Sequence, residues 1–334
     1  MTLPAFIARP APSELMISPE LRHNFAVVIP AYDEAESMSE LFESLVNTFN
    51  RYGLEGEVVL VDDGSADGTA ERALAQAARL GRFRLIRHRR NLGKTEALLS
   101  GAAVAESDWI ILFDADLQHS TDEIPRFLAE IEKGYDIVCG RKVGGYEKGV
   151  VSRVYNWLSQ RIFRVPVRDL NSMKIFRKSI LDEIRLRHDW HRFFVVLAHA
   201  RGYRVGEIDI ALYVRRHGRS KYTGSARILI GTLDLLSVWF QLFFSRKPML
   251  LFGIPGMALF LLGILVGALS VTMRLMGHGF RPLLNLVILL MIVGALLFCF
   301  AFLAEMVASL RAEVDDMRRR IDRRTAQDNG ERGL

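Results

Sequence analysis

Two carboxylates and an amide follow a strongly apolar run at Asp114, Asp116 and Gln118. The run before them, WIILF, is typical of a buried strand, so these polar side chains are expected where that strand ends. Mg²⁺ and Mn²⁺ prefer oxygen ligands, and they bind through one or two carboxylates together with substrate phosphates. Asp pairs in loops more often cap a following helix or face water. The pair therefore predicts a divalent-cation site only if other polar groups meet it.

Apolar, strand-like runs alternate with helical patterns from Phe25 to Lys142. Strands are expected at FAVVIPAY, EVVLVDDGS, RFRLIRH, WIILFDAD and DIVCGRK. Such alternation predicts an α/β fold, with a parallel sheet and helices on both of its faces. Ligands of these sheets bind beyond the carboxyl ends of the strands. Polar groups are therefore expected to meet at one edge: Pro30, Tyr32 and Glu34 after the first strand, Asp62 and Asp63 after the second, and Asp114 and Asp116 after the fourth.

Four motifs, VVIPAYDEAESM, VDDGSADGT, NLGKTEAL and DADLQ, occur in an order and spacing that resemble glycosyltransferase family 2. The resemblance covers roughly residues 25–305 and implies a catalytic domain with the glycosyltransferase A fold, which is Rossmann-like with a mostly parallel sheet. Two apolar C-terminal segments make the chain similar to the polyprenyl-phosphate (dolichol-phosphate mannose synthase-like) hexosyltransferase branch. That branch implies inverting transfer of a sugar from a UDP- or GDP-linked donor to undecaprenyl or dolichyl phosphate, giving a lipid-linked monosaccharide.

By this resemblance, residues along the expected edge bind the nucleotide sugar: Pro30, Tyr32, Glu34, Asp62, Asp63, Lys94, Asp114 and Ala115. Asp116 and Gln118 are the implied ligands of Mg²⁺ or Mn²⁺, which would neutralise the leaving nucleoside diphosphate. Lys94 opens an expected helix, where a lysine and free backbone N–H groups attract phosphate. Two alternatives stay open, because Asp62 could instead cap the turn that follows it and Lys94 could be a solvated surface lysine.

The resemblance also implies catalytic residues: Asp114, Asp116, Arg141, Arg215 and Lys221. Arg141 lies in DIVCGRK, where the donor fork of a guanidinium suits a phosphate dianion, and a plain surface arginine is the alternative. Arg215 and Lys221 flank Gly-x-Ser in RRHGRSKY, on a loop expected to close over the diphosphate.

The acceptor phosphate is assigned, by the same resemblance, to Lys148, Ser152 and Arg153 in KGVVSRVYN. A solvated loop lysine is the alternative for Lys148. The segment DLNSMKIFRK lacks the usual glycine of the family, which leaves the roles of Asp169, Asn171 and Ser172 open. His191 stands beside aromatic residues, where a packed, hydrogen-bonded histidine is more common than a catalytic one.

The chain is expected to divide into five parts: an N-terminal extension over 1–24, the catalytic domain over 25–222, a juxtamembrane amphipathic helix over 223–248, two transmembrane helices within 249–305, and a C-terminal helix with a disordered tail over 306–334. The predicted spans, 249–273 and 282–304, are uncharged and long enough as helices to cross a hydrocarbon core of about 30 Å. Core packing against the catalytic domain remains the alternative for the juxtamembrane helix.

Basic residues flank the two spans, with Arg246 and Lys247 before the first and a group of arginines after the second: Arg311, Arg318, Arg319, Arg320, Arg323 and Arg324. The positive-inside bias predicts a multi-pass inner-membrane protein with its catalytic domain and both termini in the cytoplasm. The net charge of +6 fits anionic lipid, and no nucleic-acid-binding signature is present. The a/d spacing after the second span predicts a short coiled coil between copies of the chain, with a single solvated helix as the alternative.

Two other functions stay open. A processive polysaccharide synthase of the same fold is disfavoured, because that branch usually carries Gln-x-x-Arg-Trp and more membrane helices. A non-catalytic membrane adaptor would not need Asp116, Gln118, Arg141, Arg215 and Lys221 together. The sequence does not name the sugar, although NLGK resembles the mannose and glucose synthases more than the aminoarabinose-lipid enzymes.

Overall fold

The computed structural model describes residues 11–143, 165–170, 172–184, 186, 190–213, 236–240, 248–278 and 281–332, without the side chains of 192, 315 and 318–332. The chain forms two compact units, 1–233 and 234–334. Each unit is described by itself.

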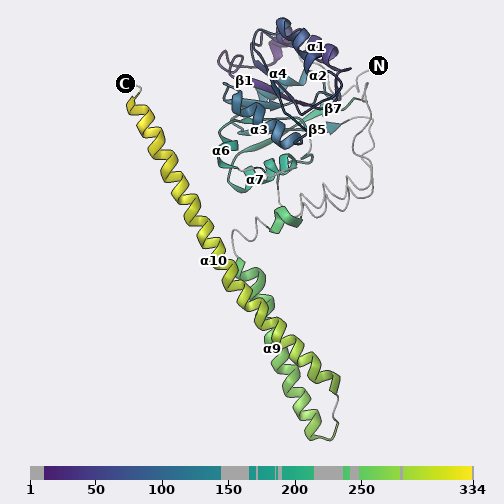
Figure 1. Cartoon of the computed structure of the whole chain (residues 1–334), viewed down its shortest axis with the longest axis vertical. Coiled ribbons are helices and arrows are strands. Elements are labelled where there is room, and N and C mark those ends of the chain that lie inside the picture. Colours follow the sequence, from purple (N-terminus) through teal and green to yellow (C-terminus); the bar gives the residue numbers. More distant parts are fainter. Residues whose placement is uncertain are drawn as a thin grey trace. The chain divides into compact units, whose positions relative to one another are not determined.

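The first unit is built on a seven-stranded sheet (Figure 1). Its strands are β1 (Phe25–Ala31), β2 (Glu57–Asp62), β3 (Phe83–Arg87), β4 (Trp109–Leu112), β5 (Ile137–Val143), β6 (Lys174–Arg177) and β7 (Val205–Ala211), in the order β3-β2-β1-β4-β6-β5-β7. All neighbours pair in parallel except β6, which is antiparallel to both β4 and β5. The expected α/β fold with a mostly parallel sheet is confirmed, as are its five expected strands, whereas β6 and β7 were not predicted.

Helices cover both faces of the sheet, as expected. The helices of this unit are α1 (Met38–Tyr52), α2 (Thr69–Gln76), α3 (Lys94–Val104), α4 (Glu123–Ile131), α6 (Ile180–Glu183) and α7 (Phe194–Ala200), with short 3₁₀ turns η1 (Pro12–Glu14), η2 (Ala77–Arg79) and η3 (Trp190–Arg192). Helix α3 packs on β1 and β2 through Gly101, where an added Cβ would lie 2.4 Å from Cγ1 of Val28. This close approach requires glycine at position 101 and holds α3 close against the sheet.

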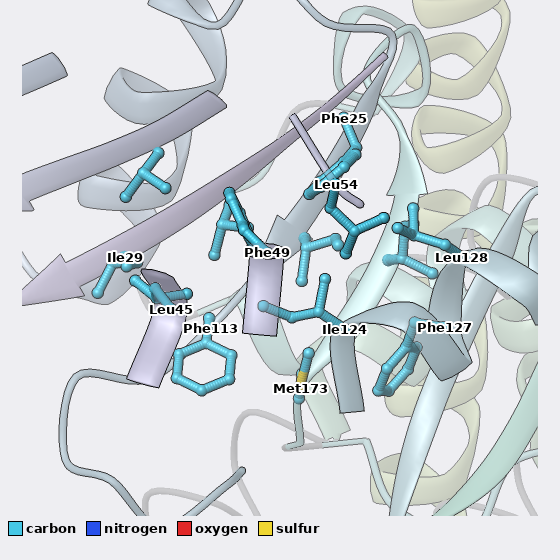
Figure 2. Close-up of a cluster of buried hydrophobic side chains, with 14 of the residues drawn as sticks. Phe25, Ile29, Leu45, Phe49, Leu54, Phe113, Ile124, Phe127, Leu128 and Met173 are labelled. Carbon is cyan, nitrogen blue, oxygen red and sulfur yellow. The ribbon is translucent and has the colours of Figure 1, made fainter. Parts of the chain in front are cut away.

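The main hydrophobic core lies on the other face of the sheet, between the strands and helices α1 and α4. Helix α1 buries Leu41, Phe42 and Leu45, whose spacing of three and four residues places them on one side of the helix. Figure 2 shows Leu45 from α1 and Phe127 from α4 in this core with Phe113, which follows β4. The core therefore anchors the strand end from which the Asp114 loop departs.

The described part of the N-terminal extension, from residue 11, belongs to the first unit. Ile17 and Leu21 are buried in the core. The Nη1 atom of Arg22 donates to the carbonyl oxygen of Tyr52 at 2.9 Å, and the carbonyl oxygen of Arg22 accepts from the amide of Glu55 at 2.9 Å. Two apolar side chains at a spacing of four thus dock the segment against the end of α1.

The second unit is a pair of long helices, α9 (Pro248–Leu275) and α10 (Arg281–Arg332), lying side by side in Figure 1. An added Cβ on Gly256 would lie 2.9 Å from the carbonyl oxygen of Gly294, and one on Gly263 would lie 2.8 Å from Cγ of Met291. The pairing is therefore antiparallel, through small residues that allow close contact. Both helices are long and apolar enough to cross a membrane, and most of their apolar side chains are exposed.

The two predicted spans, 249–273 and 282–304, lie inside these helices. Helix α10 continues to Arg332 and does not give way to disorder after Thr325. Its second half is rich in arginine, which favours helix, and it contains no proline. Most of the predicted juxtamembrane helix over 223–248 lies outside the described residues, apart from a helical stretch over 236–240.

Candidate functional site

The order of the strands places a ligand site at the carboxyl ends of β1 and β4. The connections run outward from β1 toward β2 and β3 on one side, while β4 lies on its other side. Neighbouring strands whose connections leave in opposite directions open a crevice at their carboxyl ends. Pro30 lies near the end of β1, and Asp114 follows β4 by two residues.

The loop after β4 holds the predicted metal ligands. Asp116 Oδ1 accepts from the amide of Gln118 at 3.2 Å, a side-chain turn that leaves Leu117 in the left-handed region at φ 57°. The carbonyl oxygen of Gln118 accepts from the amide of Tyr213 at 2.9 Å, which ties the loop to the segment after β7. Ala115 is buried in the core cluster. Asp116 and Gln118 therefore lie on one turn, which these hydrogen bonds hold in place.

Lys94, at the start of α3, and Asp114, after β4, form an ion pair at this edge of the sheet. Burial raises the pKa of Asp114, but the charge of Lys94 and its hydrogen bond outweigh burial and hold this pKa well below its ordinary value. Asp114 is therefore an anion at neutral pH. The side chains of Lys94 and Asp114 are 28% and 30% exposed, so a ligand can reach both. Lys94 is also the first residue of α3, where the unpaired N–H groups of the first turn add positive potential.

The nucleoside end of the predicted site is formed by the segment after β1. Tyr32 is 36% exposed, and stacking of its ring on a base stays a prediction. The amide of Glu34 donates to Oγ1 of Thr69 at 2.9 Å. Asp62 is fully buried, accepts from the amide of Ser65 at 2.9 Å, and lies 3.3 Å from Nε of Arg87. Asp62 therefore caps its turn, the structural alternative considered for it, and its role in nucleotide binding stays a prediction.

Asp63 contacts a loop 29 residues further along the chain. Its Oδ1 accepts from the amide of Leu92 at 2.9 Å, its Oδ2 accepts from the amide of Gly93 at 2.8 Å, and Oδ1 lies 2.7 Å from Nδ1 of His88. The Asp63 and His88 side chains are only 5% and 8% exposed. Asp63 thus organises the NLGK loop, and direct contact with a nucleoside remains a prediction.

Arg141 on β5 is paired with Asp209, its register partner on β7. Nε and Nη2 of Arg141 each lie 2.5 Å from a different carboxylate oxygen of Asp209. The hydrogen bonds to Asp209 raise the pKa of Arg141 further above its ordinary value. Lys142, the next residue, points to the other side of the strand, and its positive charge lowers the pKa of Asp114 and of His119. Lys142 therefore contributes positive charge at the candidate site and was not predicted, whereas a role of Arg141 at the diphosphate stays a prediction.

A buried polar cluster lies beneath the start of α3. Lys174 is 1% exposed, and its Nζ donates to the carbonyl oxygens of Leu170 at 3.0 Å and His191 at 3.4 Å. Burial lowers the pKa of Lys174 to about 8. His191 is buried with Nδ1 3.0 Å from Oγ1 of Thr95, which favours the packed role over the catalytic one. Asp169 is buried near this cluster, and its charge raises the pKa of Lys174.

Several predicted residues lie outside the described part of the chain: Lys148, Ser152, Arg153, Asn171, Arg215 and Lys221. Their assignments to the acceptor phosphate and to catalysis stay predictions. Ser172, in contrast, is described and buried, with its Oγ 3.2 Å from where a Cβ on Gly140 would lie.

Sequence reasoning also missed His119, which is buried behind the Asp114 loop. Its Nδ1 lies 3.4 Å from the carbonyl oxygen of Ala211, and burial lowers its pKa, so the imidazole is neutral at pH 7. Its position directly after DADLQ could have marked His119 as a residue near the site. For Lys174 the signal was a lysine amid the apolar residues of MKIF, because a charge inside a buried strand must be paired.

The donor set fits a divalent cation that arrives with a nucleotide. No group of three or more His, Cys, Asp or Glu side chains that could hold a metal ion by themselves occurs among the described residues. One carboxylate and one amide oxygen, from Asp116 and Gln118, match the few protein ligands that Mg²⁺ takes when phosphates complete its shell. The residues therefore fit an ion that is bound jointly by the protein and the nucleotide phosphates, and not an ion enclosed by protein ligands alone.

Comparison with known proteins agrees with this geometry. The family model for Glycosyl transferase family 2 matches residues 26–204, more than half of the chain. A dodecaprenyl-phosphate galacturonate synthase from Rhizobium johnstonii is 32% identical over 295 residues, which cover 85% of this chain and 87% of that protein. An undecaprenyl-phosphate 4-deoxy-4-formamido-L-arabinose transferase from Proteus mirabilis is 29% identical over 86% of this chain and 90% of its own. These relatives do not support the resemblance of NLGK to mannose and glucose synthases.

Solved structures share the fold of the first unit. Glucosyl-3-phosphoglycerate synthase from Mycobacterium tuberculosis, crystallised with Mn²⁺, UDP and glucosyl-3-phosphoglycerate, superposes with a TM-score of 0.54 at 16% identity, over 72% of this chain and 86% of that one. The same enzyme with Mg²⁺ and UDP gives a TM-score of 0.52 at 17% identity, over 64% of this chain and 79% of that one. The model match over residues 26–204 and the 32% identity to a relative along most of its length show that the chain belongs to glycosyl transferase family 2.

Proposed function

We propose that this protein transfers a sugar, with inversion, from a nucleotide sugar to a polyprenyl phosphate, giving a lipid-linked monosaccharide. One observation carries the proposal: the Lys94–Asp114 pair and the Asp116–Gln118 turn lie together after the carboxyl end of β4. The site combines a cation, a helix start and metal-binding oxygens, which together suit a nucleoside diphosphate.

The relatives support the acceptor class. Their names specify dodecaprenyl phosphate and undecaprenyl phosphate as the lipids on which they act. Alignments of 295 and 303 residues extend well beyond the 26–204 range of the family model. The similarity therefore includes sequence outside the nucleotide-binding half, where lipid recognition is expected.

On the donor side, we assign the nucleotide to the segment after β1 and to the NLGK loop. Tyr32 offers a ring face to the base, Lys94 and the start of α3 attract the diphosphate, and Asp114 faces the ribose or the sugar. Asp116 and Gln118 would hold Mg²⁺ or Mn²⁺, which neutralises the departing nucleoside diphosphate. The solved structures that contain Mn²⁺ or Mg²⁺ with UDP make these ions reasonable choices.

On the acceptor side, the reaction needs no strong general base. A phosphomonoester is mostly a dianion near neutral pH, because its second pKa is about 6. One of its oxygens attacks the anomeric carbon, and the bond from this carbon to the diphosphate oxygen breaks, with the electron pair leaving on the nucleoside diphosphate. Direct attack from the opposite side inverts the anomeric centre. Arg141, Lys148, Arg215 and Lys221 would offset the repulsion between the two anions.

For the membrane, we propose an inner-membrane enzyme with two spans and with the catalytic unit and both termini in the cytoplasm. The support is the pair of long apolar helices α9 and α10 and the arginines that follow the second span. An anchored enzyme meets a lipid phosphate at the headgroup level far more often than a free one does. Self-association through the apolar positions of α10 after residue 306 remains a prediction.

The test is a transfer assay on the purified full chain. The protein is incubated with undecaprenyl phosphate, Mg²⁺ or Mn²⁺, and a panel of labelled nucleotide sugars that includes uronic acid and aminoarabinose donors. We expect lipid-extractable label from one donor, and its loss with chelator. The stereochemistry of the product, read by NMR, should be opposite to that of the donor.

Two variants make the assay specific. Asp116→Asn removes one anionic metal ligand and should abolish transfer, whereas Asp182→Asn changes an exposed carboxylate on α6 and should leave transfer intact. A folded wild-type chain that transfers none of the sugars with either metal would refute the enzymatic proposal and favour an adaptor. Transfer that survives chelation and Asp116→Asn would refute the role of the metal.

A further inference from the structure

Three side chains from separate segments form a hydrogen-bonded row beside the candidate site. Nδ1 of His88, which follows β3, lies 2.7 Å from Oδ1 of Asp63, and Nε2 of His88 lies 3.0 Å from Oγ of Ser100 on α3. The Asp63 and His88 side chains are 5% and 8% exposed. A histidine that bridges two elements by both ring nitrogens is held in one orientation.

The residue types match those of a serine hydrolase, but the position of the serine excludes that chemistry. Ser100 lies inside α3, which runs from Lys94 to Val104. Backbone N–H groups in a helix interior donate to the carbonyl four residues earlier, so none remains to stabilise an oxyanion at Ser100. Any effect of these three side chains on the site must therefore pass through the backbone amides that Asp63 binds.

Asp63 holds the last two residues before α3. Its two oxygens accept from the amides of Leu92 and Gly93, and Gly93 has φ 91° and ψ 161°, a conformation that favours glycine. The loop is also confined from the β2 side, because an added Cβ on Gly64 would lie only 2.5 Å from the carbonyl carbon of Arg90. The backbone that enters α3 is thus fixed on both sides.

Lys94 is the next residue after this fixed backbone, and its ammonium reaches Asp114. A lysine side chain has four flexible bonds, so the position of its charge depends on where its backbone is held. We propose that His88 is a positioning residue: by orienting Asp63, it fixes Leu92 and Gly93 and so places Lys94 for the diphosphate of the donor. This inference rests on the proposed function in one respect, the assignment of Lys94 to the diphosphate.

The test compares two substitutions of His88 that keep different nitrogens. Asparagine places its amide nitrogen near Nδ1 and can still donate to Asp63, whereas glutamine places its nitrogen near Nε2 and can reach only Ser100. We expect His88→Gln to weaken binding of UDP with Mn²⁺ about tenfold, the loss of roughly one charge-assisted contact. His88→Asn should stay within about twofold of the wild type, by the same scale. Binding is measured by calorimetry on the full chain, with GDP replacing UDP if the wild type prefers it.

A second readout separates positioning from a general structural effect. Uridine lacks the diphosphate, so its affinity, measured by competition, should be the same for His88→Gln and the wild type. Lys94→Ala should weaken UDP binding by itself, and adding His88→Gln to it should cause no further loss, because both act on one contact. His23→Gln, at an exposed histidine 3.2 Å from Glu55, is the matched control and should change nothing.

Three outcomes would overturn the inference. One is an unchanged UDP affinity in His88→Gln, another is an equal loss for UDP and uridine, and the third is full additivity with Lys94→Ala. Failure of the proposed function gives a different result: UDP would bind and respond to His88→Gln, while no sugar would reach the lipid. A wild-type chain that binds neither UDP nor GDP would refute both.

Discussion

Lys174 allows a quantitative test of the buried cluster under α3. The lysine is 1% exposed and its pKa is lowered by burial from 10.5 to about 8. Between these two values the unfolded chain binds more protons than the folded chain, so stability rises with pH. Below pH 8 the buried charge costs about 3 kcal/mol, since each pH unit between the two pKa values is worth about 1.4 kcal/mol.

The substitution Lys174→Met keeps the length of the side chain and removes the charge. Wild-type chain should gain about 2 kcal/mol of unfolding free energy between pH 7 and pH 9.5 from this residue, and the variant should not. The difference between the two proteins reports on Lys174 together with its neighbour Cys139, whose thiol has its pKa raised by burial to about 12. Tyr203, whose pKa is also raised to about 12, titrates in both proteins and cancels.

The measurement is urea-induced unfolding of the full chain in detergent at the two pH values, followed by tryptophan fluorescence. Trp109 and Trp190 are buried in the first unit and report on it. Lys133→Met, at a side chain that is 65% exposed, is the control and should show the wild-type dependence on pH. An equal stability difference between wild type and Lys174→Met at both pH values would show that the ammonium is not buried as described.

Three further predictions follow from packing and pairing. Gly294→Leu should separate α9 from α10 and lower the unfolding midpoint of the full chain, because even a Cβ there would lie 2.6 Å from the backbone nitrogen of Phe260. Gly267→Ala is the control and should be tolerated, because its Cβ would lie 3.4 Å from Cγ1 of Val287. Phe127→Ala should cost about 3–5 kcal/mol of unfolding free energy, because the ring is fully buried. Asp209→Asn should change stability by less than about 1 kcal/mol, because the pair with Arg141 is partly exposed, yet raise the KM for the donor; an unchanged KM would separate Arg141 from the donor.

The parallel half of the sheet could be predicted because its strands are buried on both faces and read as apolar runs. The run EVVLV, for example, became β2 with every residue buried. Strand β6 was missed because it has only four residues and begins with Lys174. Strand β7 was missed because Glu207 and Asp209 interrupt its apolar pattern, and its pairing with β5 is a contact between distant segments.

The candidate site was predictable in its position but less so in its contacts. Residues at the ends of β1, β2 and β4 meet as the sheet requires, since strand ends are fixed by topology. The contacts of Asp63 were not foreseeable, because its donors are backbone amides 29 and 30 residues away, and any residue type supplies such amides. Arg141 was assigned from the family resemblance, and Lys142 was not considered, because the sequence alone does not indicate which face of β5 each residue occupies.

The reversed strand β6 also determines when the sheet can be completed during synthesis. Once residue 143 has been made, β1 to β4 can pair with one another, whereas β5 still lacks both of its neighbours, β6 and β7. Until Lys174–Arg177 emerges, β4 presents an unpaired, apolar edge of the kind that recruits strands from other molecules. If synthesis stalls before this point, the partly formed sheet keeps the edge of β4 exposed to aggregation. Correct folding therefore depends on the synthesis of the four residues of β6, which come late in the first unit.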